Sequence, residues 1–362
     1  MIMEKTEDLN NRIEWIDIAK CIGILLVIIG HTVYYNVYGS GLRGIIFSFH
    51  MPLFFILSSI TFKNSKDGNQ FINKIQRGYK KLIIPALTAY IIYILIDIYK
   101  QHALLFNLNF WKEKLYTFIF ASGVKVSFNG NDVIPMGMLW FFFVLFTGRI
   151  IFDYLHLVFE ENQLFIVCCI ISFIGIMLGK IQWLPFSLDI TLAVIPFFYI
   201  GYKLKKYKVT VKPFRKMILW AQVFIMTLAI TFPDYKDWTY MELAMRRYTL
   251  FPICYITSVA GTLFVCEISV LLYMYLKKII KPICYLGRNS LYIFFIHYYD
   301  FLWRKIWTIE GHQFYSAFIR VVIDICVFLC AAILVNLVKK LTRITKIYFI
   351  QKSKFHVIQD KY

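Results

Sequence analysis

Ten long apolar runs follow one another along the chain, and they constrain its fold more than any other feature. A bilayer core about 30 Å thick is crossed by roughly 20 helical residues, so each run predicts one membrane-spanning helix. Because 59% of the 362 residues are hydrophobic and only 17% are charged, the chain has too little polar surface to cover soluble domains. The sequence therefore predicts an all-α polytopic membrane protein, a bundle of about ten transmembrane helices.

The predicted spans are Ile16–Tyr35, Leu42–Phe62, Leu82–Tyr99, Met138–Leu157, Leu164–Gly179, Pro185–Tyr202, Phe214–Phe232, Leu250–Leu276, Ile283–Trp303 and Ala317–Val338. We also expect an interfacial helix within Leu104–Gly137. The polar N-terminal segment and the lack of a small-residue cleavage site after the first run predict that the first span is retained.

Basic residues are divided unequally between the two sides of the predicted bundle. Counted over the loops, 25 lie on the side of the two termini and 11 on the opposite side. Cytoplasmic loops hold the excess of Lys and Arg, so both termini are predicted to be cytoplasmic. The net charge of +19 then follows from this topology and from attraction to anionic lipid in the bilayer, and no nucleic acid partner is expected.

The eight cysteines lie within or at the edge of apolar runs and form no C-x-x-C pair. Disulfides and zinc sites need cysteines in polar loops or at ligand spacing. We therefore expect small buried hydrophobic side chains, and no metal.

The first predicted span, WIDIAKCIGILLVIIGHT, carries Asp17, Lys20 and His31. Ionisable groups inside a bilayer are costly unless they pair or face a cavity, which makes them functional candidates. Asp17 and Lys20 have a second interpretation, an i,i+3 ion pair that snorkels to the cytoplasmic edge. His31 cannot snorkel, and its alternative is a neutral core histidine hydrogen-bonded to a neighbouring helix.

Two further histidines lie at a similar depth. His50 stands beside Pro52, whose ring frees a backbone carbonyl, and His297 lies in LGRNSLYIFFIHYYD. At a rise of about 1.5 Å per residue, His31, His297 and His50 lie about 22, 21 and 18 Å from the cytoplasmic side. We therefore predict that the three histidines share one polar cavity.

Five sequence elements occur in a fixed order: Asp17-x2-Lys20-x10-His31; His50-Met-Pro-Leu-Phe-Phe-x-Leu-Ser58; the basic run RGYKKLIIP ending at Pro85; Leu139-Trp140-Phe141; and Leu286-Gly287-x2-Ser290-Leu291 with His297. On these elements the chain resembles the membrane-bound acyltransferase family 3. The His-Met-Pro form is closest to its branch similar to fucose 4-O-acetylases, which are carbohydrate O-acetyltransferases. The resemblance implies one transmembrane acyltransferase domain over residues 1–350 and a short basic cytoplasmic tail over 351–362.

The resemblance further implies transfer of an acyl group, usually acetyl from acetyl-CoA, to a hydroxyl of a carbohydrate or cell-envelope glycan. It assigns the core functional pair to His31 and Lys20, and contact with the donor at the cytoplasmic face to Arg77 and Lys81. It also implies a bacterial protein of the plasma or inner membrane. Ser59 departs from the Gly of many members, and Lys20 and Lys81 replace Arg, which loses bidentate geometry.

The residues suit this chemistry without the family comparison. Acyl transfer from a thioester to an alcohol needs a base that works near neutral pH, and His31 is our candidate. The phosphates of CoA would meet Arg77, Lys80 and Lys81, for which positive-inside anchoring is the alternative. The further catalytic candidates are Lys20, Asp17 and His50, and the candidates for substrate binding are His297, Ser290 and Trp140.

Other charged and aromatic residues receive no site role. Arg149 and Asp153 are predicted to form an i,i+4 ion pair. Tryptophans near span ends, such as Trp183, are expected in the interfacial belt, with sugar stacking as the alternative. Helix contacts alone are expected for Glu267, Asp324 and Asp97.

Two rival functions fit the same features. A transporter or flippase for lipid-linked sugars would also use ten helices and buried charges. Such proteins often have paired broken helices and internal symmetry, and the sequence suggests neither. A catalytically silent sensor or assembly subunit would not need Lys20 and His31 intact.

Overall fold

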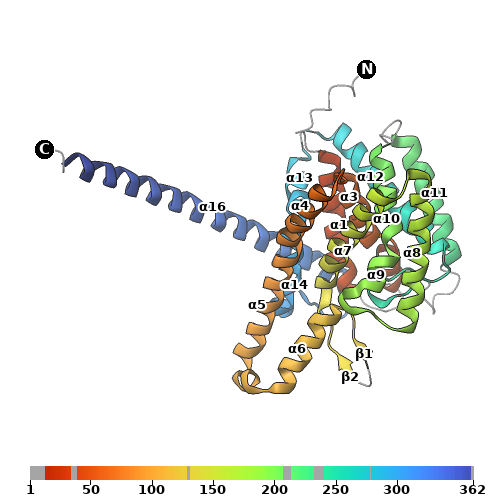
Figure 1. Ribbon diagram of the computed structural model, residues 1–362, viewed down its shortest axis with the longest axis horizontal. Helices are drawn as coiled ribbons and strands as arrows, with labels where there is room; N and C mark the ends of the chain where they lie inside the picture. The colour runs from red at the N-terminus through yellow and green to blue at the C-terminus, as the bar shows by residue number, and fades with distance from the viewer. Residues whose placement is uncertain are drawn as a thin grey trace.

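The computed structural model describes residues 13–33, 39–128, 131–206, 213–231, 240–277 and 279–359 (Figure 1). Most of them are helical, and the strands among them form a single two-stranded sheet. Seven helical segments in this part of the chain are long and apolar enough to cross a membrane, and a bent helix pair adds an eighth. The predicted all-α polytopic membrane fold is confirmed.

The helices that coincide with predicted spans are α1 (Glu14–Thr32), α2 (Gly39–Phe47) with α3 (His50–Thr61), α5 (Ile84–Lys100), α7 (Trp140–Val158), α8 (Glu161–Ile181), α11 (Pro213–Thr231), α12 (Ile253–Tyr275) and α16 (Gln313–Gln359). Two further predicted spans contain α9 (Leu188–Ala193) with α10 (Ile195–Lys206), and α13 (Lys281–Arg288) with α14 (Ser290–Tyr299). The other α-helices and strands are α4 (Gly68–Gly78), α6 (Leu108–Phe120), β1 (Val126–Phe128), β2 (Asn131–Val133) and α15 (Arg304–Trp307). One π-helical turn, Tyr79–Ile83, joins α4 to α5. The backbone of α16 continues as helix past the predicted end at Val338 and extends away from the bundle (Figure 1).

Three predicted spans are interrupted. A turn at Ser48 and Phe49 separates α2 from α3, α9 and α10 meet at an angle of 52°, and the predicted Ile283–Trp303 span is divided between α13 and α14. Pro196 is the second residue of α10, and proline cannot donate the backbone hydrogen bond that would continue the α9 helix. The expectation that the chain lacks broken helices is therefore wrong.

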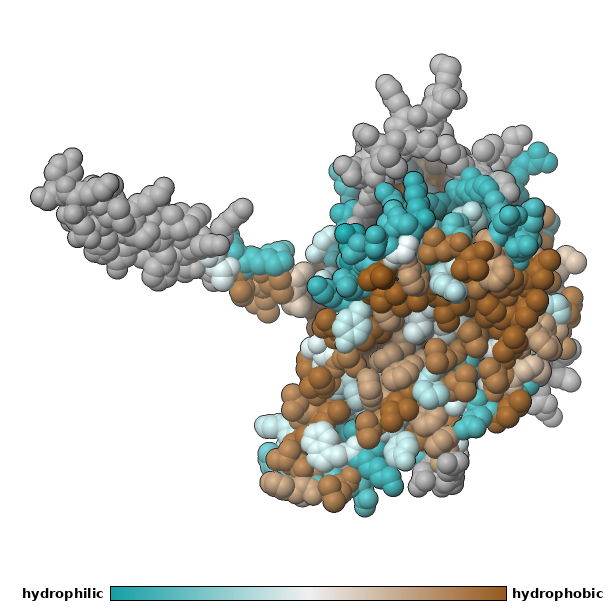
Figure 2. All heavy atoms as spheres, viewed as in Figure 1, coloured by the Kyte–Doolittle hydropathy of each residue, from teal (hydrophilic) through white to brown (hydrophobic). Residues whose placement is uncertain are grey.

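The surface has an apolar belt between two polar ends. Figure 2 shows hydrophobic atoms across the middle of the visible face and hydrophilic atoms gathered above and below them. α4 lies toward the upper end, and the β1–β2 hairpin lies at the lower end (Figure 1). α6 occupies the region of the predicted interfacial helix and runs beside α5, to which the Lys114–Asp97 ion pair joins it. This division suits a bundle whose belt faces lipid.

α1 is the central helix and contacts α2, α3, α12, α13, α14 and α16. Near its N-terminal end it lies against α13, where a Cβ on Gly287 would stand 1.7 Å from the carbonyl oxygen of Asp17. Only glycine allows two helix backbones to approach so closely. The glycine of the Leu286-Gly287 element therefore fixes α13 against the Asp17 turn of α1.

α3 lies equally close to α10. A Cβ on Gly201 would stand 2.4 Å from the Ile56 carbonyl oxygen and 2.7 Å from the Ser59 Cβ. The Ser59 hydroxyl donates to the Phe198 carbonyl oxygen at 2.6 Å. Ser59, which departs from the glycine of the resembled family, is thus accommodated by a glycine on the facing helix.

Two smaller expectations need correction. Arg149 Nε donates to the Ser58 hydroxyl at 2.6 Å, and Asp153 accepts from the backbone and side chain of Ser65, so the predicted Arg149–Asp153 ion pair is wrong. Each of the two side chains bonds to a serine on another segment, and not to the residue one turn away on its own helix. Five of the eight cysteines are buried as expected, whereas exposed positions on α8 and α16 hold Cys169, Cys326 and Cys330.

Candidate active site

Three helices bring His31, His50 and His297 together. His31 is the second-last residue of α1, His50 the first residue of α3, and His297 lies in α14. The ring centroids of His31 and His297 are 5.7 Å apart. Phe47 joins the third histidine to this pair, because its ring centroid lies 5.5 Å from that of His31 and 4.6 Å from that of His50.

A small cavity lies beside these rings. Its volume is about 40 Å³, which holds a few ordered waters and no sugar. Trp140 and Phe294 form part of its wall together with His31 and His50, whereas His297 lies behind His31 and is buried. Its complete lining is Val27, His31, Phe47, His50, Met51, Met138, Trp140, Glu242, Leu243, Ala244 and Phe294.

The orientation of His50 is fixed by the break between α2 and α3. Its Nδ1 lies 2.9 Å from the Ile46 carbonyl oxygen. A carbonyl can only accept, so Nδ1 carries the proton and Nε2 of the neutral ring is left as an acceptor. Pro52 frees the Ser48 carbonyl as the sequence indicates, but the hydroxyl of Ser258 donates to this oxygen, which therefore does not serve the cavity.

Glu242, in the loop before α12, pairs with Arg43 of α2 at the wall of the cavity. Glu242 lines the cavity, accepts from the Tyr240 hydroxyl at 3.0 Å and forms an ion pair with Arg43 at 3.4 Å. Arg43 Nη1 donates to the Gly30 carbonyl oxygen at 2.7 Å, directly before His31. Sequence reasoning missed this pair, because 199 residues separate the two side chains and neither belongs to a motif.

A buried charge cluster holds His297. Its Nδ1 lies 2.9 Å from Asp300 Oδ2 and 3.1 Å from Asp324 Oδ2. Arg320 donates to Asp300 through Nε at 2.5 Å and Nη2 at 2.8 Å, and through Nη1 to the Thr32 hydroxyl at 3.1 Å. Asp324, to which the sequence assigned helix contacts alone, is therefore part of the site. The high free energy of a carboxylate inside an apolar span indicates a functional role for Asp324, but the spacing of the sequence does not show that His297 is its partner.

Three ligand atoms of this cluster, from His297, Asp300 and Asp324, lie within 4.8 Å of one another. Such a group can hold a cation. Here the Arg320 guanidinium already contacts both oxygens of Asp300 and supplies positive charge at that position. A metal ion at the same carboxylate would stand against this charge, so we assign no metal to the cluster.

The other predicted site residues of α1 lie at its far end. Lys20 is eleven residues from His31, a rise of about 16 Å, so the predicted functional pair is not in contact. Asp17 is buried, and its carboxylate lies 3.7 Å from Arg288 Nε. Ser290, the first residue of α14, lies seven residues before His297 and does not line the histidine cavity.

The predicted donor residues lie at the α4 end of the bundle. Arg77 belongs to the last turn of α4, and Lys80 and Lys81 to the π-helical turn that follows. All three side chains are exposed. Exposure suits contact with the phosphates of a soluble donor, and it suits positive-inside anchoring equally well.

One family model, described as an acyltransferase domain, matches residues 13–338. The chain belongs to the acyltransferase 3 family. No curated protein and no solved structure matches it. The matched range contains the histidine cavity, the His297 cluster and the basic turn after α4, so all of them belong to the domain of a multi-pass membrane acyltransferase.

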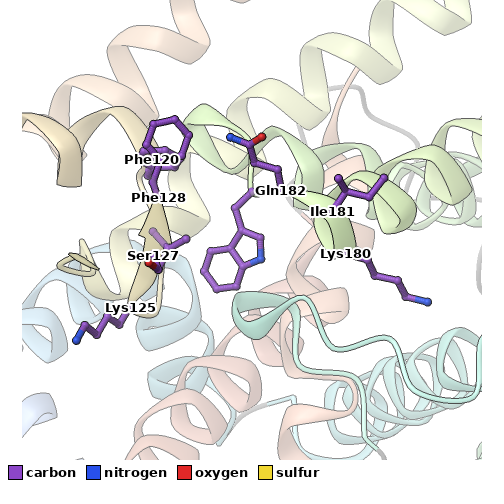
Figure 3. Close-up of a pocket in the computed structure, with 9 residues that line it drawn as sticks. Phe120, Lys125, Ser127, Phe128, Lys180, Ile181 and Gln182 are labelled. Carbon is purple, nitrogen blue, oxygen red and sulfur yellow. The ribbon is translucent and has the colours of Figure 1, made fainter. Parts of the chain in front are cut away.

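This acyltransferase has a second, larger cavity of about 380 Å³ between the β1–β2 hairpin and the end of α8 (Figure 3). The side chains of Lys125 and Lys180 point away from one another there. The segment leading into β1 packs against the wall of the histidine cavity, because a Cβ on Gly123 would stand 2.4 Å from the Trp140 ring. The larger cavity is lined by Phe120, Lys125, Val126, Ser127, Phe128, Lys180, Ile181, Gln182 and Trp183.

Proposed function

We propose that this membrane acyltransferase transfers an acyl group, as acetyl, from acetyl-CoA at the cytoplasmic face to a hydroxyl of a carbohydrate or cell-envelope glycan. The cavity lined by His31 and His50, with the ring of His297 next to that of His31, lies inside an acyltransferase domain and carries the proposal. Transfer to a hydroxyl needs a base, and histidine is the side chain that gains and loses a proton near neutral pH.

His31 is the proposed base, because it lines the cavity and its imidazole forms no hydrogen bond within the described part of the chain. The hydroxyl proton passes to a ring nitrogen of His31 as the acceptor oxygen bonds to the acyl carbonyl carbon. The C–S bond of the thioester then breaks, and CoA leaves with a proton. His50, through its free Nε2, accepts a hydrogen bond from a neighbouring hydroxyl of the acceptor sugar and so orients the reacting one.

The donor side is assigned to the α4 end. Arg77, Lys80 and Lys81 meet the phosphates of CoA, and their exposure supports access from water. Lys20 and Asp17, at the N-terminal end of α1, belong to this side as well. About 16 Å of helix separates Lys20 from His31 and about 21 Å separates Asp17 from it, so the acyl group travels along α1 to the base.

The acceptor side is assigned to the hairpin end. Trp140 and Glu242 line the histidine cavity, and the larger cavity lies beyond the Gly123 contact with Trp140. An aromatic ring and a carboxylate are suited to a sugar, one through stacking and the other through hydroxyl hydrogen bonds. A cavity of about 40 Å³ must widen to admit the sugar ring, so binding involves movement of the 240–252 loop or the hairpin.

The test uses inside-out vesicles of host membrane with acetyl-CoA labelled in the acetyl group. Label that enters base-labile esters of the envelope glycan with wild-type protein, and not with His31→Ala inserted at equal amount, supports the proposal. Mass spectrometry of glycans from cells with and without the gene identifies the acceptor. Transfer that is unchanged without the gene contradicts it.

The broken helices α9–α10 and α13–α14 are a feature that a transporter or flippase shares. A flippase would change the side on which lipid-linked sugars are found without consuming acetyl-CoA. The same vesicles separate the two functions, because only an acyltransferase incorporates label in proportion to the CoA released.

A further inference from the structure

The charges around His297 do not balance while its ring is neutral. Asp300 is matched by Arg320 through two hydrogen bonds. Asp324 is fully buried, and among the described residues its one ion-pair partner is His297. A neutral His297 thus leaves one uncompensated negative charge in the cluster, whereas a protonated His297 neutralises it.

Two buried atoms of the cluster have no hydrogen-bond partner among the described residues. They are Nε2 of His297 and Oδ1 of Asp324. With Nδ1–H donated to the two carboxylates, Nε2 of the neutral ring carries a lone pair, and the ring lies next to that of His31. An acceptor held in this way, beside a carboxylate that stabilises the imidazolium, is the arrangement of the histidine in a Ser-His-Asp triad.

His31 has the opposite surroundings. Arg43 donates to the carbonyl of the residue before it, Gly30, and Arg320 donates to the side chain of the residue after it, Thr32. No carboxylate contacts the His31 ring within the described part of the chain. A proton on His31 thus has no carboxylate in contact to balance it, whereas a proton on His297 has two.

We infer that His297 is the proton store of the site and that Asp324 is the positioning residue which gives it this role. The inference rests on the proposed function. His31 takes the proton as the acceptor O–H bond breaks and releases it to Nε2 of His297, where Asp324 balances the imidazolium. The proton then returns through His31 to the sulfur of the departing CoA, which restores neutral His297. Asp300 and Arg320 hold the ring in place.

The groups that face His297 come from three elements besides α14. α1 contributes His31, the stretch at Asp300–Trp303 contributes Asp300, and α16 contributes Arg320 and Asp324. Arg320 matches Asp300 in this set, so removing Asp324 takes away the counter-charge of the imidazolium. The loss is expected in kcat and not in the KM for acetyl-CoA, because the proposed donor contacts lie at the α4 end of the bundle.

The experiment measures transfer of labelled acetyl from acetyl-CoA to endogenous glycan in inside-out vesicles over a series of acetyl-CoA concentrations. Asp324→Asn is expected to lower kcat per inserted molecule about 30- to 1,000-fold and to leave the KM for acetyl-CoA unchanged. Asp324→Glu, which keeps the charge, is expected to recover most of the rate. Asp189→Asn changes a buried carboxylate outside the cavity. It is the matched control and is expected to keep a normal kcat per folded molecule.

A loss of less than about threefold in Asp324→Asn overturns the inference, as does an Asp324→Glu enzyme that recovers none of the rate. If Asp324→Asn does not accumulate in the membrane, His297→Gln decides instead, since the amide retains a donor to the carboxylates but cannot store a proton. It is expected to lower kcat about 30-fold or more and to leave the acetyl-CoA KM unchanged, and a near-normal kcat overturns the inference. Wild-type protein that transfers no label overturns the proposed function and the proton store together.

Discussion

Two buried arginines of this acyltransferase, Arg246 and Arg320, are held alike and differ in what surrounds them. Arg246 binds Asp189 through Nε at 2.7 Å and Nη2 at 3.3 Å, and its guanidinium lies 3.8 Å above the centre of the Trp183 ring. Its Nη1 donates to the Ser122 hydroxyl at 3.2 Å. The backbone N–H of residue 184 donates to the same carboxylate, so both of its oxygens have partners.

Arg320 repeats this arrangement at the other site. It binds both oxygens of Asp300, stacks on Trp307 at 4.2 Å and donates to a hydroxyl, that of Thr32. Here the carboxylate also accepts from a histidine, and a second carboxylate, that of Asp324, adds a charge that no arginine in the described ranges pairs with.

The difference distinguishes an ion pair that only holds the fold together, that of Arg246, from a cluster that can also take up a proton, that of Arg320. An Arg–Asp pair with every nitrogen and oxygen bonded can hold helices and loops together, and it has nothing left to exchange. An added carboxylate and an imidazole give a group that can change its protonation while the arginine holds the geometry. Burial alone distinguishes nothing here, because Asp189 and Asp324 are both fully buried.

The largest expected effect is at the histidine cavity. His31→Ala removes the proposed base, and kcat is expected to fall about 100- to 10,000-fold with little change in the KM for acetyl-CoA. Initial rates with labelled acetyl-CoA, divided by the amount of inserted protein, measure it. His50→Ala is expected to lose less, because His50 only orients the acceptor.

Normal amounts of inserted His31→Ala protein that keep more than about a tenth of the wild-type rate would remove His31 from the mechanism. The base would then be His50, whose Nε2 is free to accept. The structural difference between the two arginine clusters would still hold, but His31 would no longer be the group that passes a proton to His297.

Breaking the Arg246–Asp189 pair is expected to lower the amount of folded protein and to leave the rate per folded molecule unchanged. Asp189→Asn leaves the buried Arg246 without its counter-charge, which costs about 3 to 5 kcal/mol for a pair of this kind. The expected result is a lower unfolding temperature in detergent and less protein in the membrane, with a normal rate per folded molecule. A stable variant with a low rate would place Asp189 in the chemistry and break the comparison.

The positions of most of the spans and the meeting of the histidines could be predicted from the sequence. A long apolar run has few alternatives to a spanning helix, and the rise per residue then gives the depth of His31, His50 and His297. The glycine of Leu286-Gly287 is explained only by the structure, since it needs the backbone of Asp17 opposite it.

The charge pairs could not be predicted, because they depend on how each helix is rotated and on breaks within helices. Asp300 and Arg320 are 20 residues apart, and Arg43 and Glu242 are 199 apart. Local spacing also misleads: Arg149 and Asp153 are one turn apart, yet they bond to Ser58 and Ser65. In an apolar span a charge indicates that a partner exists without indicating which one.

The smallest effect is expected where charges are exposed. Arg77, Lys80 and Lys81 are open to solvent, so each is expected to contribute less than about 1 kcal/mol to donor binding. Replacing all three with Gln should raise the KM for acetyl-CoA about tenfold, weaken its dependence on salt, and leave kcat and the acceptor KM unchanged. Saturation curves at two ionic strengths in inside-out vesicles measure both quantities.

The matched control replaces Lys63 and Lys66, two exposed lysines just before α4, with Gln. This control lowers the positive charge at the same end of the bundle. It should leave the acetyl-CoA KM almost unchanged if Arg77, Lys80 and Lys81 contact the phosphates directly, because direct contacts depend on the position of each charge, whereas diffuse attraction depends only on the total charge. If the control and the triple variant raise this KM alike, the basic turn acts as a diffuse surface charge. If neither raises it, the three residues serve positive-inside anchoring, and the donor phosphates bind elsewhere in the domain.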